Sequence, residues 1–276
     1  MLDLMLGNTD DAVSTGEVFA LFRPYMPHHL SPECSCGNPD CDFWAGLLDI
    51  PANQFHASIL RQRPNAKTVV DSSKDLRWVV DSNVWAHKQG LPVKNVVIWK
   101  NAKDLSYSYW RRGDSISMYR NQFLTYYGRL LDLGLPFVAL NYQTLVDDTQ
   151  STLRELCLQL GLAYDDSRME FWRKQHHHFF GSSGTKRQVG KSDSSIKKVT
   201  DFPDEFLRLF EDEQEWLESS AEFNLVVEQL RARDVSQHPN LDEEANLSAL
   251  RPIWYYRHAL KSAWWKIFPS QALVQD

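Results

Sequence analysis

The sequence predicts an α/β fold in which a parallel sheet is flanked by helices. Three short runs rich in β-branched residues, at 67–73, 95–101 and 137–142, are bounded by polar residues. Each run is nearly continuous rather than alternating, which is the pattern of a strand buried on both faces of a parallel sheet. Helical patterns separate the runs, and this alternation of strand and helix is typical of layered α/β domains.

The helical patterns follow the second and third of these strands. A helix is expected to open at residues 102–112, directly after the second strand. Residues 115–133 then place apolar side chains near one face and stop at a Gly-Leu-Pro sequence. Residues 152–162 carry apolar residues at positions i, i+3, i+4 and i+7 and end near Gly161.

The composition suits one large domain and excludes several classes of protein. The chain has 276 residues, of which 43% are apolar and 24% charged, so it is neither disordered throughout nor a small disulfide scaffold. The net charge of −6 does not favour binding to nucleic acid or to an anionic membrane. No stretch reaches the ~18 apolar residues of a membrane-spanning helix, and residues 1–6 lack the features of a signal peptide. A cytoplasmic protein is therefore expected.

The charge is unevenly distributed along the chain. Residues 173–198 contain seven Lys and Arg against one Asp, whereas residues 201–250 contain fourteen acidic residues against three Arg. The acidic stretch has helical periodicity, so most of its charge is expected on a solvated helix face. The basic stretch lacks periodicity from residue 181 onward. This predicts either a solvated surface loop or a lid that supplies cations to a bound anion.

These patterns predict three parts of the chain. Residues 1–233 form the α/β domain, residues 234–250 a linker, and residues 251–276 a C-terminal helix rich in aromatic and basic residues. That helix is expected to pack on the domain or on a second copy of the chain, and the second arrangement would make a homodimer. An amphipathic helix at a membrane surface is the alternative.

Two predicted strands end in polar residues suited to binding an anion. The first run ends at residues 71–74 and the second at Lys100 and Asn101. Ligands of parallel sheets bind outside the carboxyl ends of the strands. Lys100 and Ser108 flank the start of the helix at 102–112, so they and the backbone N–H groups between them could form a phosphate cradle. A strand end that is merely solvated is the alternative.

The stretch VVIWKNAKDLSYSYWRR (96–112) resembles the 3′-phosphate-binding strand, loop and helix of the sulfotransferases that use 3′-phosphoadenosine 5′-phosphosulfate (PAPS). In that family a basic residue at the strand end is followed eight positions later by a serine, and Lys100 and Ser108 fill these positions. The family usually has arginine at the first position. Lysine offers a point charge in place of a bidentate fork, which should weaken phosphate binding without abolishing it.

Further stretches, in the same order, are similar to sulfotransferase segments up to about residue 190. They resemble the stretch after the first helix, a cysteine-containing insert common in bacterial members, the second strand, a later strand end and a late glycine-containing loop. In this chain they are STGEVFALF (14–22), CSCGNPDCDFW (34–44), VVDSSK (69–74), LNYQTLVDD (140–148) and HHHFFGSSGTKR (176–187). The resemblance of the fourth implies that Tyr142 lies near the nucleotide.

The resemblance implies a site and a reaction. Glu17 would be the general base towards a hydroxyl or amine acceptor, and Lys74 would stabilise the leaving phosphate oxygen. Lys100, Ser108 and Arg187 would hold the 3′-phosphate. The implied reaction uses PAPS as co-substrate and requires no metal. The acceptor, a small molecule or a peptide, is not identified by the sequence, because a fold does not determine its substrate.

The resemblance also implies a three-layer parallel sheet of the type found in P-loop NTPases. One departure is large, because the family's first strand and the loop that wraps the 5′-phosphosulfate have no counterpart here. Residues 1–8 are similar to the end of the helix that follows that loop. A start upstream of Met1 is expected, since loss of a central strand would leave backbone groups of its neighbours unpaired. The alternative is a catalytically inactive relative that binds a nucleotide or a protein.

Three cysteines are crowded into one segment, at Cys34, Cys36 and Cys41. With His28 or His29 they could complete a tetrahedral zinc site, as in an interaction protein stabilised by metal, although the spacing is not that of a common zinc knuckle. A local disulfide and free thiols are the other interpretations, and the sequence leaves all three open. The adjacent histidines at 176–178 cannot all ligate one ion from regular structure, so a loop or phosphate-proximal position is expected for them.

Overall fold

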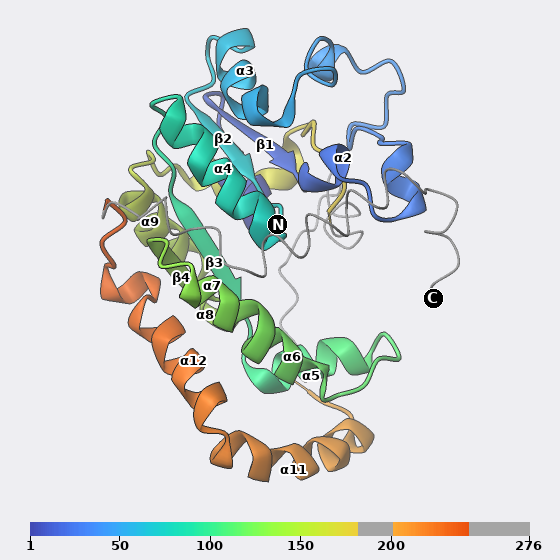
Figure 1. Ribbon diagram of the computed structural model, residues 1–276, viewed down its shortest axis with the longest axis vertical. Helices are drawn as coiled ribbons and strands as arrows, with labels where there is room; N and C mark the ends of the chain where they lie inside the picture. Colours follow the sequence, from blue (N-terminus) through green and yellow to red (C-terminus); the bar gives the residue numbers. More distant parts are fainter. Residues whose placement is uncertain (182–200, 243–276) are drawn as a thin grey trace. The chain divides into compact units, whose positions relative to one another are not determined.

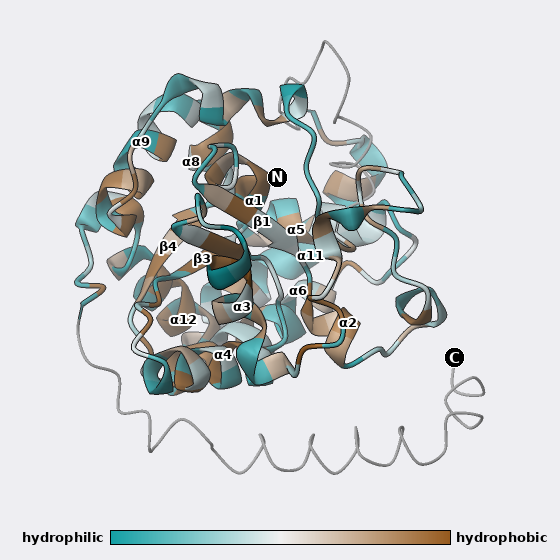
Figure 2. Ribbon diagram, turned by 90° about the horizontal axis from the view of Figure 1, so that it is seen from above, coloured by the Kyte–Doolittle hydropathy of each residue, from teal (hydrophilic) through white to brown (hydrophobic). Residues whose placement is uncertain are grey.

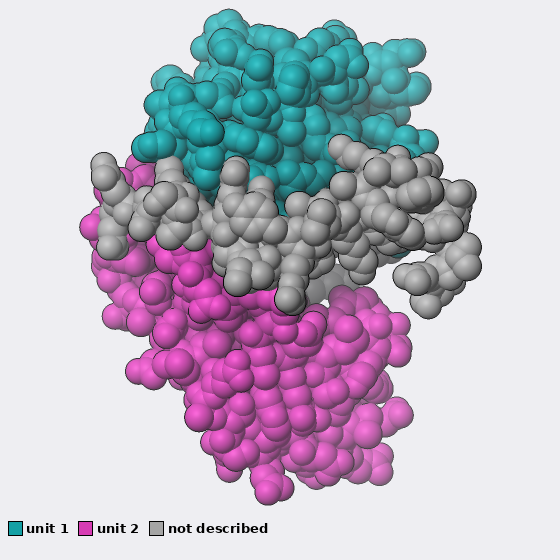
Figure 3. Space-filling view, viewed as in Figure 1, with its two compact units in different colours: residues 1–93, 167–194, 247–276 teal, residues 94–166, 195–246 magenta. Residues whose placement is uncertain are grey.

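The computed structural model describes residues 1–181 and 201–242 (Figure 1). The chain divides into two compact units (Figure 3), each of which is described by itself. Residues 1–93 and 167–181 are the described part of unit 1, and residues 94–166 and 201–242 are that of unit 2. Each unit contains a two-stranded parallel sheet together with helices, so the chain is a mixed α/β protein.

The sheet of unit 1 pairs β1 (Ala12–Gly16) with β2 (Thr68–Asp71) in parallel, with an irregularity in register before Gly16. Five short helices connect the two strands: α2 (Phe19–Phe22), η1 (Pro27–Leu30), η2 (Asp42–Trp44), η3 (Ala52–Gln54) and α3 (Phe55–Gln62). The remaining helical elements are α1 (Leu2–Leu6), α4 (Leu76–Lys88) and η5 (Asp166–Arg173). The core gathers large side chains from these connections, among them Trp44, Leu47, Phe55, Ile59 and Trp78.

The start of α4 is fixed by a side-chain cap. The carboxylate of Asp75 accepts hydrogen bonds from the backbone N–H groups of Arg77 and Trp78, both at 3.0 Å. Such a cap satisfies donors that the first helical turn leaves without partners. Because Asp75 directly follows Lys74, this cap fixes the backbone next to Lys74.

A segment far along the chain lies beside the end of β1. The N–H of Phe179 donates to the Thr15 carbonyl at 3.0 Å, and the N–H of Glu17 donates to the Phe179 carbonyl at 3.1 Å. Gly16, between them, has φ +74°, and a Cβ there would lie 2.0 Å from the Phe179 oxygen. Only glycine fits this position, since it tolerates both the left-handed backbone and the close approach.

The sheet of unit 2 pairs β3 (Asn95–Trp99) with β4 (Phe137–Asn141) in parallel, in register from Asn95 opposite Phe137 to Trp99 opposite Asn141. The crossover consists of α5 (Ala102–Trp110), α6 (Met118–Asn121), the π-helical stretch η4 (Gln122–Tyr127) and α7 (Gly128–Asp132). After β4 follow α8 (Tyr142–Asp147), α9 (Thr149–Leu160), α11 (Asp204–Ser219), α12 (Ala221–Ala232) and η6 (Val235–Gln237). Hydrophobic residues dominate β4 (Figure 2). The strand is buried along its whole length.

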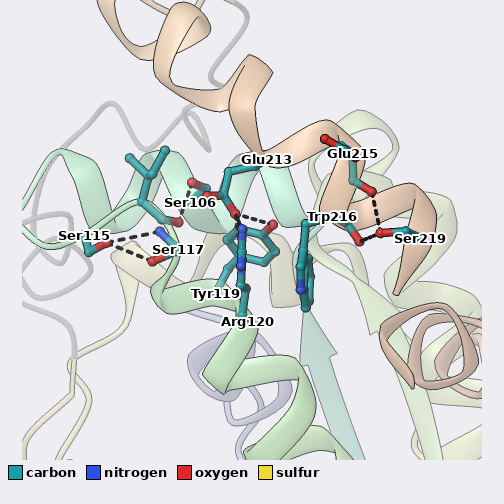
Figure 4. Close-up of polar contacts among 10 residues, drawn as sticks. Ser106, Ser115, Ser117, Tyr119, Arg120, Glu213, Glu215, Trp216 and Ser219 are labelled. Carbon is teal, nitrogen blue, oxygen red and sulfur yellow. Dashed lines mark hydrogen bonds and ion pairs between the residues drawn. The ribbon is translucent and has the colours of Figure 1, made fainter. Parts of the chain in front are cut away.

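A buried carboxylate attaches α11 to α6 (Figure 4). Glu213 accepts hydrogen bonds from the hydroxyl of Tyr119 and from Nε of Arg120, both at 2.8 Å. The Arg120 guanidinium also lies 4.4 Å from the centroid of the Trp216 ring. Glu213 is a buried exception in the acidic stretch, whose charge lies mostly on exposed helix positions, as expected. The stretch forms two helices, because Ser220 caps α12 through the N–H of Phe223.

The three predicted strands are confirmed as β2, β3 and β4, and the predicted helices correspond to α5, to α6 through α7, and to α9. Burial on both faces holds only for β4, since β2 is half-buried and Ile98 of β3 is exposed. Strand β1 was not expected. The described residues form two sheets of two strands, and a single three-layer sheet stays a prediction.

The C-terminal predictions fall largely outside the described residues, as does Arg187. Of the expected linker at 234–250, residues 234–242 are described; they begin with η6, where Val235 is buried and Asp234 bridges to Ala139 of β4. The expected helix at 251–276 is outside the described residues. Within the described part of the chain, every helix is too short or too polar to cross a membrane.

Candidate functional site

Lys100 lies directly after β3 and contacts two of the residues predicted to accompany it. Its Nζ donates a hydrogen bond to Ser108 Oγ at 3.2 Å and lies 4.6 Å from the centroid of the Tyr142 ring. Ser108 lies on α5, and Tyr142 is the first residue of α8. Three elements of unit 2 therefore bring these side chains together. Their role in binding a phosphate stays a prediction.

The ammonium of Lys100 is half-buried, and the Asp104 carboxylate acts on it through space without forming an ion pair. Among the residues that the structure describes, Lys100 forms no ion pair. Burial lowers the pKa of Lys100, and the positive charge of Arg112 adds to this effect, while the negative charge of Asp104 opposes it. A cation that has lost part of its hydration without gaining a direct ion pair is well placed to attract an anion.

The hydroxyl of Ser108 already donates its hydrogen within α5. Its Oγ donates to the Asp104 carbonyl at 2.8 Å, one turn earlier in the helix. Because a serine hydroxyl has one hydrogen to donate, its lone pairs are what face Lys100. The side chain therefore acts as an acceptor from Lys100 in this structure and would act as a donor only after rotating away from Asp104.

Two asparagines join the ends of β3 and β4 next to Lys100. Asn141 donates through Nδ2 to Oδ1 of Asn101 at 3.0 Å and accepts through Oδ1 from the N–H of Gln143 at 2.8 Å. The second bond caps α8, which begins with Tyr142. Asn141 therefore fixes the position of Tyr142 relative to the end of β3.

Glu17 and Lys74 form an ion pair in unit 1. The Lys74 Nζ lies 2.5 Å from Glu17 Oε1, and the side chain of Lys74 is 72% exposed against 22% for Glu17. Glu17 follows β1 by one residue and Lys74 follows β2 by three. Parallel pairing places both strand ends at the same edge of the sheet, which is why the two side chains meet.

A buried carboxylate shapes the turn between β2 and Lys74. Asp71 accepts from the N–H of Ser73 at 2.8 Å and from the indole N–H of Trp78 at 2.7 Å, and its Oδ2 lies 3.0 Å from Nε2 of His56. Burial alone would raise the pKa of Asp71, but the hydrogen bonds and charge of His56, with the bonds from Ser73 and Trp78, lower it. Ser73 Oγ in turn accepts from the N–H of Phe19 at 2.9 Å, which ties this turn to the residues after Glu17.

The predicted site residues thus form two groups, one in each unit. Unit 2 holds Lys100, Ser108 and Tyr142, and unit 1 holds Glu17 and Lys74. A cavity of about 310 Å³ in unit 1 lies beside neither group. It is lined by residues around the start of β1 and by the segments at 62–66 and 174–177.

The cysteine segment gathers around a histidine that the sequence did not single out. Cys34, Cys36, Cys41 and His177 each offer one ligand atom, and these atoms lie within 4.8 Å of one another. All four cysteines of the chain are free thiols in the structure, so the local disulfide is not formed. The expected ligands His28 and His29 are not members of this cluster, and His29 instead accepts from the N–H groups of Tyr25 and Met26 through Nδ1.

Hydrogen bonds among the three thiols of this cluster shift the pKa values of Cys34 and Cys36 in opposite directions. Burial raises the pKa of the Cys34 thiol to about 12, and its hydrogen bonds with the other two thiols act in the same direction. Burial also acts to raise the pKa of Cys36, but hydrogen bonds from the Asn38 N–H and from the thiols of Cys34 and Cys41 lower it overall. These shifts favour the thiolate form at Cys36 over that at Cys34.

Two kinds of residue were missed. Asn141 could have been found, since it stands between a strand and a helix, where asparagine is a favoured cap. The sequence shows its partner Asn101 as a polar residue at a strand end but does not indicate its bond to Asn141. His177 could not have been singled out, because 136 residues separate it from Cys41 and neither neighbouring histidine differs from it in local sequence.

Comparisons with protein-family models, with curated proteins and with solved structures found no match to this chain.

Proposed function

We propose that this chain is a sulfotransferase that moves a sulfuryl group from PAPS to a hydroxyl or amine acceptor. The observation that carries the proposal is the half-buried ammonium of Lys100, 3.2 Å from Ser108 Oγ and without an ion-pair partner among the described residues. A dianionic phosphate would supply the missing counter-charge. The two side chains reach it from the end of a parallel strand and from the following helix, where phosphates are commonly bound.

Binding of the 3′-phosphate would reorganise the hydrogen bonds of Ser108. Its hydroxyl hydrogen would move from the Asp104 carbonyl to a phosphate oxygen, and the Lys100 Nζ would donate to a second oxygen. Asn101 leaves the first turn of α5 without a side-chain cap, so backbone N–H groups there can also face the anion. Tyr142, whose ring lies beside Lys100, would contact the nucleotide.

The chemical step needs a base and a cation, which Glu17 and Lys74 would supply. The acceptor oxygen or nitrogen forms a bond to sulfur as the bond from sulfur to the leaving phosphate oxygen breaks. The acceptor proton passes to the Glu17 carboxylate, and the charge that develops on the leaving oxygen is stabilised by the Lys74 ammonium. In the structure each of these groups neutralises the other, so the substrates would have to replace this ion pair.

The proposal includes the three-layer fold of that family, with a parallel sheet flanked by helices. The parallel pairing of β1 with β2 and of β3 with β4, each with helical connections, supports it. Arg187, which lies outside the described residues, would close over the 3′-phosphate.

Calorimetric titration with adenosine 3′,5′-bisphosphate and with adenosine 5′-monophosphate tests the proposal. The unmodified chain should prefer the bisphosphate, and Lys100→Ala should reduce its affinity about 10- to 100-fold, since a charged hydrogen bond is worth ~1.5–3 kcal/mol. Affinity for the monophosphate should hardly change. Lys67→Ala is the matched control, because the Lys67 side chain is 80% exposed and the substitution removes one positive charge away from Lys100.

Two outcomes would contradict the proposal in different ways. Equal affinity of the unmodified chain for the two nucleotides would show that it has no 3′-phosphate site. A clear preference for the bisphosphate, with no transfer of labelled sulfate from PAPS to any of a panel of hydroxyl and amine acceptors, would instead identify an inactive relative that binds nucleotide.

A further inference from the structure

We propose that Cys34, Cys36, Cys41 and His177 form a structural zinc site in unit 1. Four ligand atoms, three thiolate sulfurs and one imidazole nitrogen, are the set that closes a tetrahedral zinc centre. With Zn–S near 2.3 Å and Zn–N near 2.1 Å, the ligand atoms of a regular tetrahedron lie roughly 3.6–3.8 Å apart. Here Nδ1 of His177 lies 3.6 Å from the Cys34 sulfur and 3.3 Å from the Cys41 sulfur, and all four atoms lie within 4.8 Å of one another.

Turns in the segment between Cys34 and Cys41 bring the thiols together. The N–H of Gly37 donates to the Cys34 carbonyl at 3.0 Å, and Gly37 adopts φ +74°, which reverses the chain. Asn38 then accepts from the N–H of Asp40 at 3.0 Å through its side chain. The cysteines therefore converge because of the backbone between them.

Hydrogen bonds attach this segment to the strand-like residues around His177. The N–H of Ser35 donates to the His178 carbonyl at 2.9 Å, and its hydroxyl donates to the His176 carbonyl at 2.7 Å. Ser35 Oγ also accepts from the N–H of His178 at 3.0 Å. These bonds bracket His177 on both sides, so its position beside the thiols is set by the backbone and does not depend on side-chain rotation alone.

The ring of His177 is held with Nδ1 towards the sulfurs. It stacks on Phe43, with the ring centroids 4.5 Å apart and the planes within 4° of each other, and the Arg63 guanidinium lies 4.4 Å from the Phe43 ring. The neighbouring His176 points elsewhere, since its Nε2 lies 2.7 Å from the Phe171 carbonyl. Only the middle histidine of the three therefore reaches the cluster.

Four protein ligands leave no open position for substrate, so the metal would be structural. Each thiol would release its proton to solvent as its sulfur binds the metal. The site would join the segment at 34–41 to residues 176–179, and Phe179 in turn accepts from the N–H of Glu17. Loss of the metal should therefore loosen the edge of β1 as well as the cysteine segment.

The decisive measurement is the metal content of the full chain, purified under reducing conditions with an affinity tag that contains no histidine. Elemental analysis should give about one zinc per chain. Replacement of zinc by cobalt(II) should give the charge-transfer and intense visible bands of a tetrahedral thiolate site. His177→Gln and Cys41→Ser should each lower the zinc content severalfold, whereas Cys157→Ala, which removes the fourth cysteine, and His28→Gln should leave it unchanged.

A second measurement keeps the proposal testable if a ligand variant fails to fold. Thiol titration of the unmodified, folded chain should find three thiols that become reactive only after a chelator is added. A zinc-free chain with no cobalt spectrum would overturn the proposal. So would a disulfide between two of the three cysteines in the reduced preparation, or the same metal content in His177→Gln as in His28→Gln.

Discussion

The side chains of Asn101 and Asn141 join the ends of two neighbouring parallel strands through a hydrogen bond of 3.0 Å. Asn141 is the last residue of β4 and Asn101 stands two positions after the end of β3, and the same Asn141 caps α8. Because Tyr142 and Lys100 flank this bond in the sequence, it determines how closely the aromatic ring approaches the ammonium.

Asn141→Ala should destabilise unit 2 by about 1–2 kcal/mol, because it removes a helix cap and a buried hydrogen bond together. Urea denaturation followed by circular dichroism measures the change. Gln143→Ala is the control: its side chain donates to the exposed Asp147 within the same helix, and a loss below about 0.5 kcal/mol is expected. Equal losses in the two variants would show that the Asn101–Asn141 bond contributes nothing.

Gly16→Ala should be far more harmful than Gly90→Ala. Both glycines have positive φ, +74° and +66°, so both substitutions incur a backbone penalty of about 1–2 kcal/mol. Only at Gly16 would the new methyl group meet a backbone oxygen, at 2.0 Å, whereas Gly90 has nothing within 4 Å. The difference between the thermal unfolding midpoints of the two variants measures the cost of the close contact with Phe179. Similar midpoints in the two variants would contradict this close contact.

Glu213→Ala should cost about 3 kcal/mol, because it leaves the partly buried guanidinium of Arg120 and the hydroxyl of Tyr119 without their acceptor. Glu215→Ala, an exposed position two residues further along α11, is the matched control and should change the free energy of unfolding by less than about 0.5 kcal/mol. A double-mutant cycle with Tyr119→Phe should show coupling between the two residues. Additive losses would mean that the hydroxyl and the carboxylate do not interact.

The pH dependence of stability should carry a contribution from Asp71. A carboxyl group whose pKa is lower in the folded than in the unfolded chain stabilises the fold above its unfolded pKa of about 3.9. That stabilisation is lost as the pH falls through the folded pKa. The difference in unfolding free energy between the unmodified chain and Asp71→Asn should therefore be constant near neutral pH and shrink below about pH 4. His56→Gln should weaken the same dependence, and an unchanged difference across this range would contradict the interpretation.

Glu17→Gln should lower the rate of sulfate transfer by about 10²–10⁴ and leave nucleotide affinity nearly intact, because glutamine cannot take the acceptor proton. Lys74→Ala removes the other member of the ion pair and should lower turnover as well. The measurement is the turnover number with a saturating acceptor, beside a calorimetric titration of the nucleotide. Unchanged turnover in Glu17→Gln would exclude this residue as the base.

The features that could be predicted best from the sequence are those formed by residues close together in the chain. The β-branched runs identified β2, β3 and β4, and the spacing of Lys100 and Ser108 across one strand, loop and helix placed their side chains in contact. Strand β1 was missed because its sequence, AVSTG, has only one long apolar side chain and ends in glycine. Its residues pair with partners 55 or 56 positions away in the sequence, and a local sequence pattern does not indicate such distant pairing.

The fourth member of the cysteine cluster shows the same limit. The three cysteines at 34–41 indicated a candidate metal site from the sequence alone. The histidine that joins them is His177 and not the nearer His28 or His29. Nothing in the local sequence indicates that Ser35 would bond to the backbone on either side of His177. Long-range contacts of this kind follow from the path of the whole chain.

The edge of β1 has a consequence for how the protein is made. Phe179, which bonds to Thr15 and Glu17, leaves the ribosome more than 160 residues after them, and unit 2 begins in between. Unit 1 therefore cannot complete its hydrogen bonding until Phe179 has been synthesised, and unit 2 must also wait for α11 and α12. Such interleaved chains expose unfinished strands to aggregation while translation continues, so yield in cells should respond to chaperone supply and growth temperature.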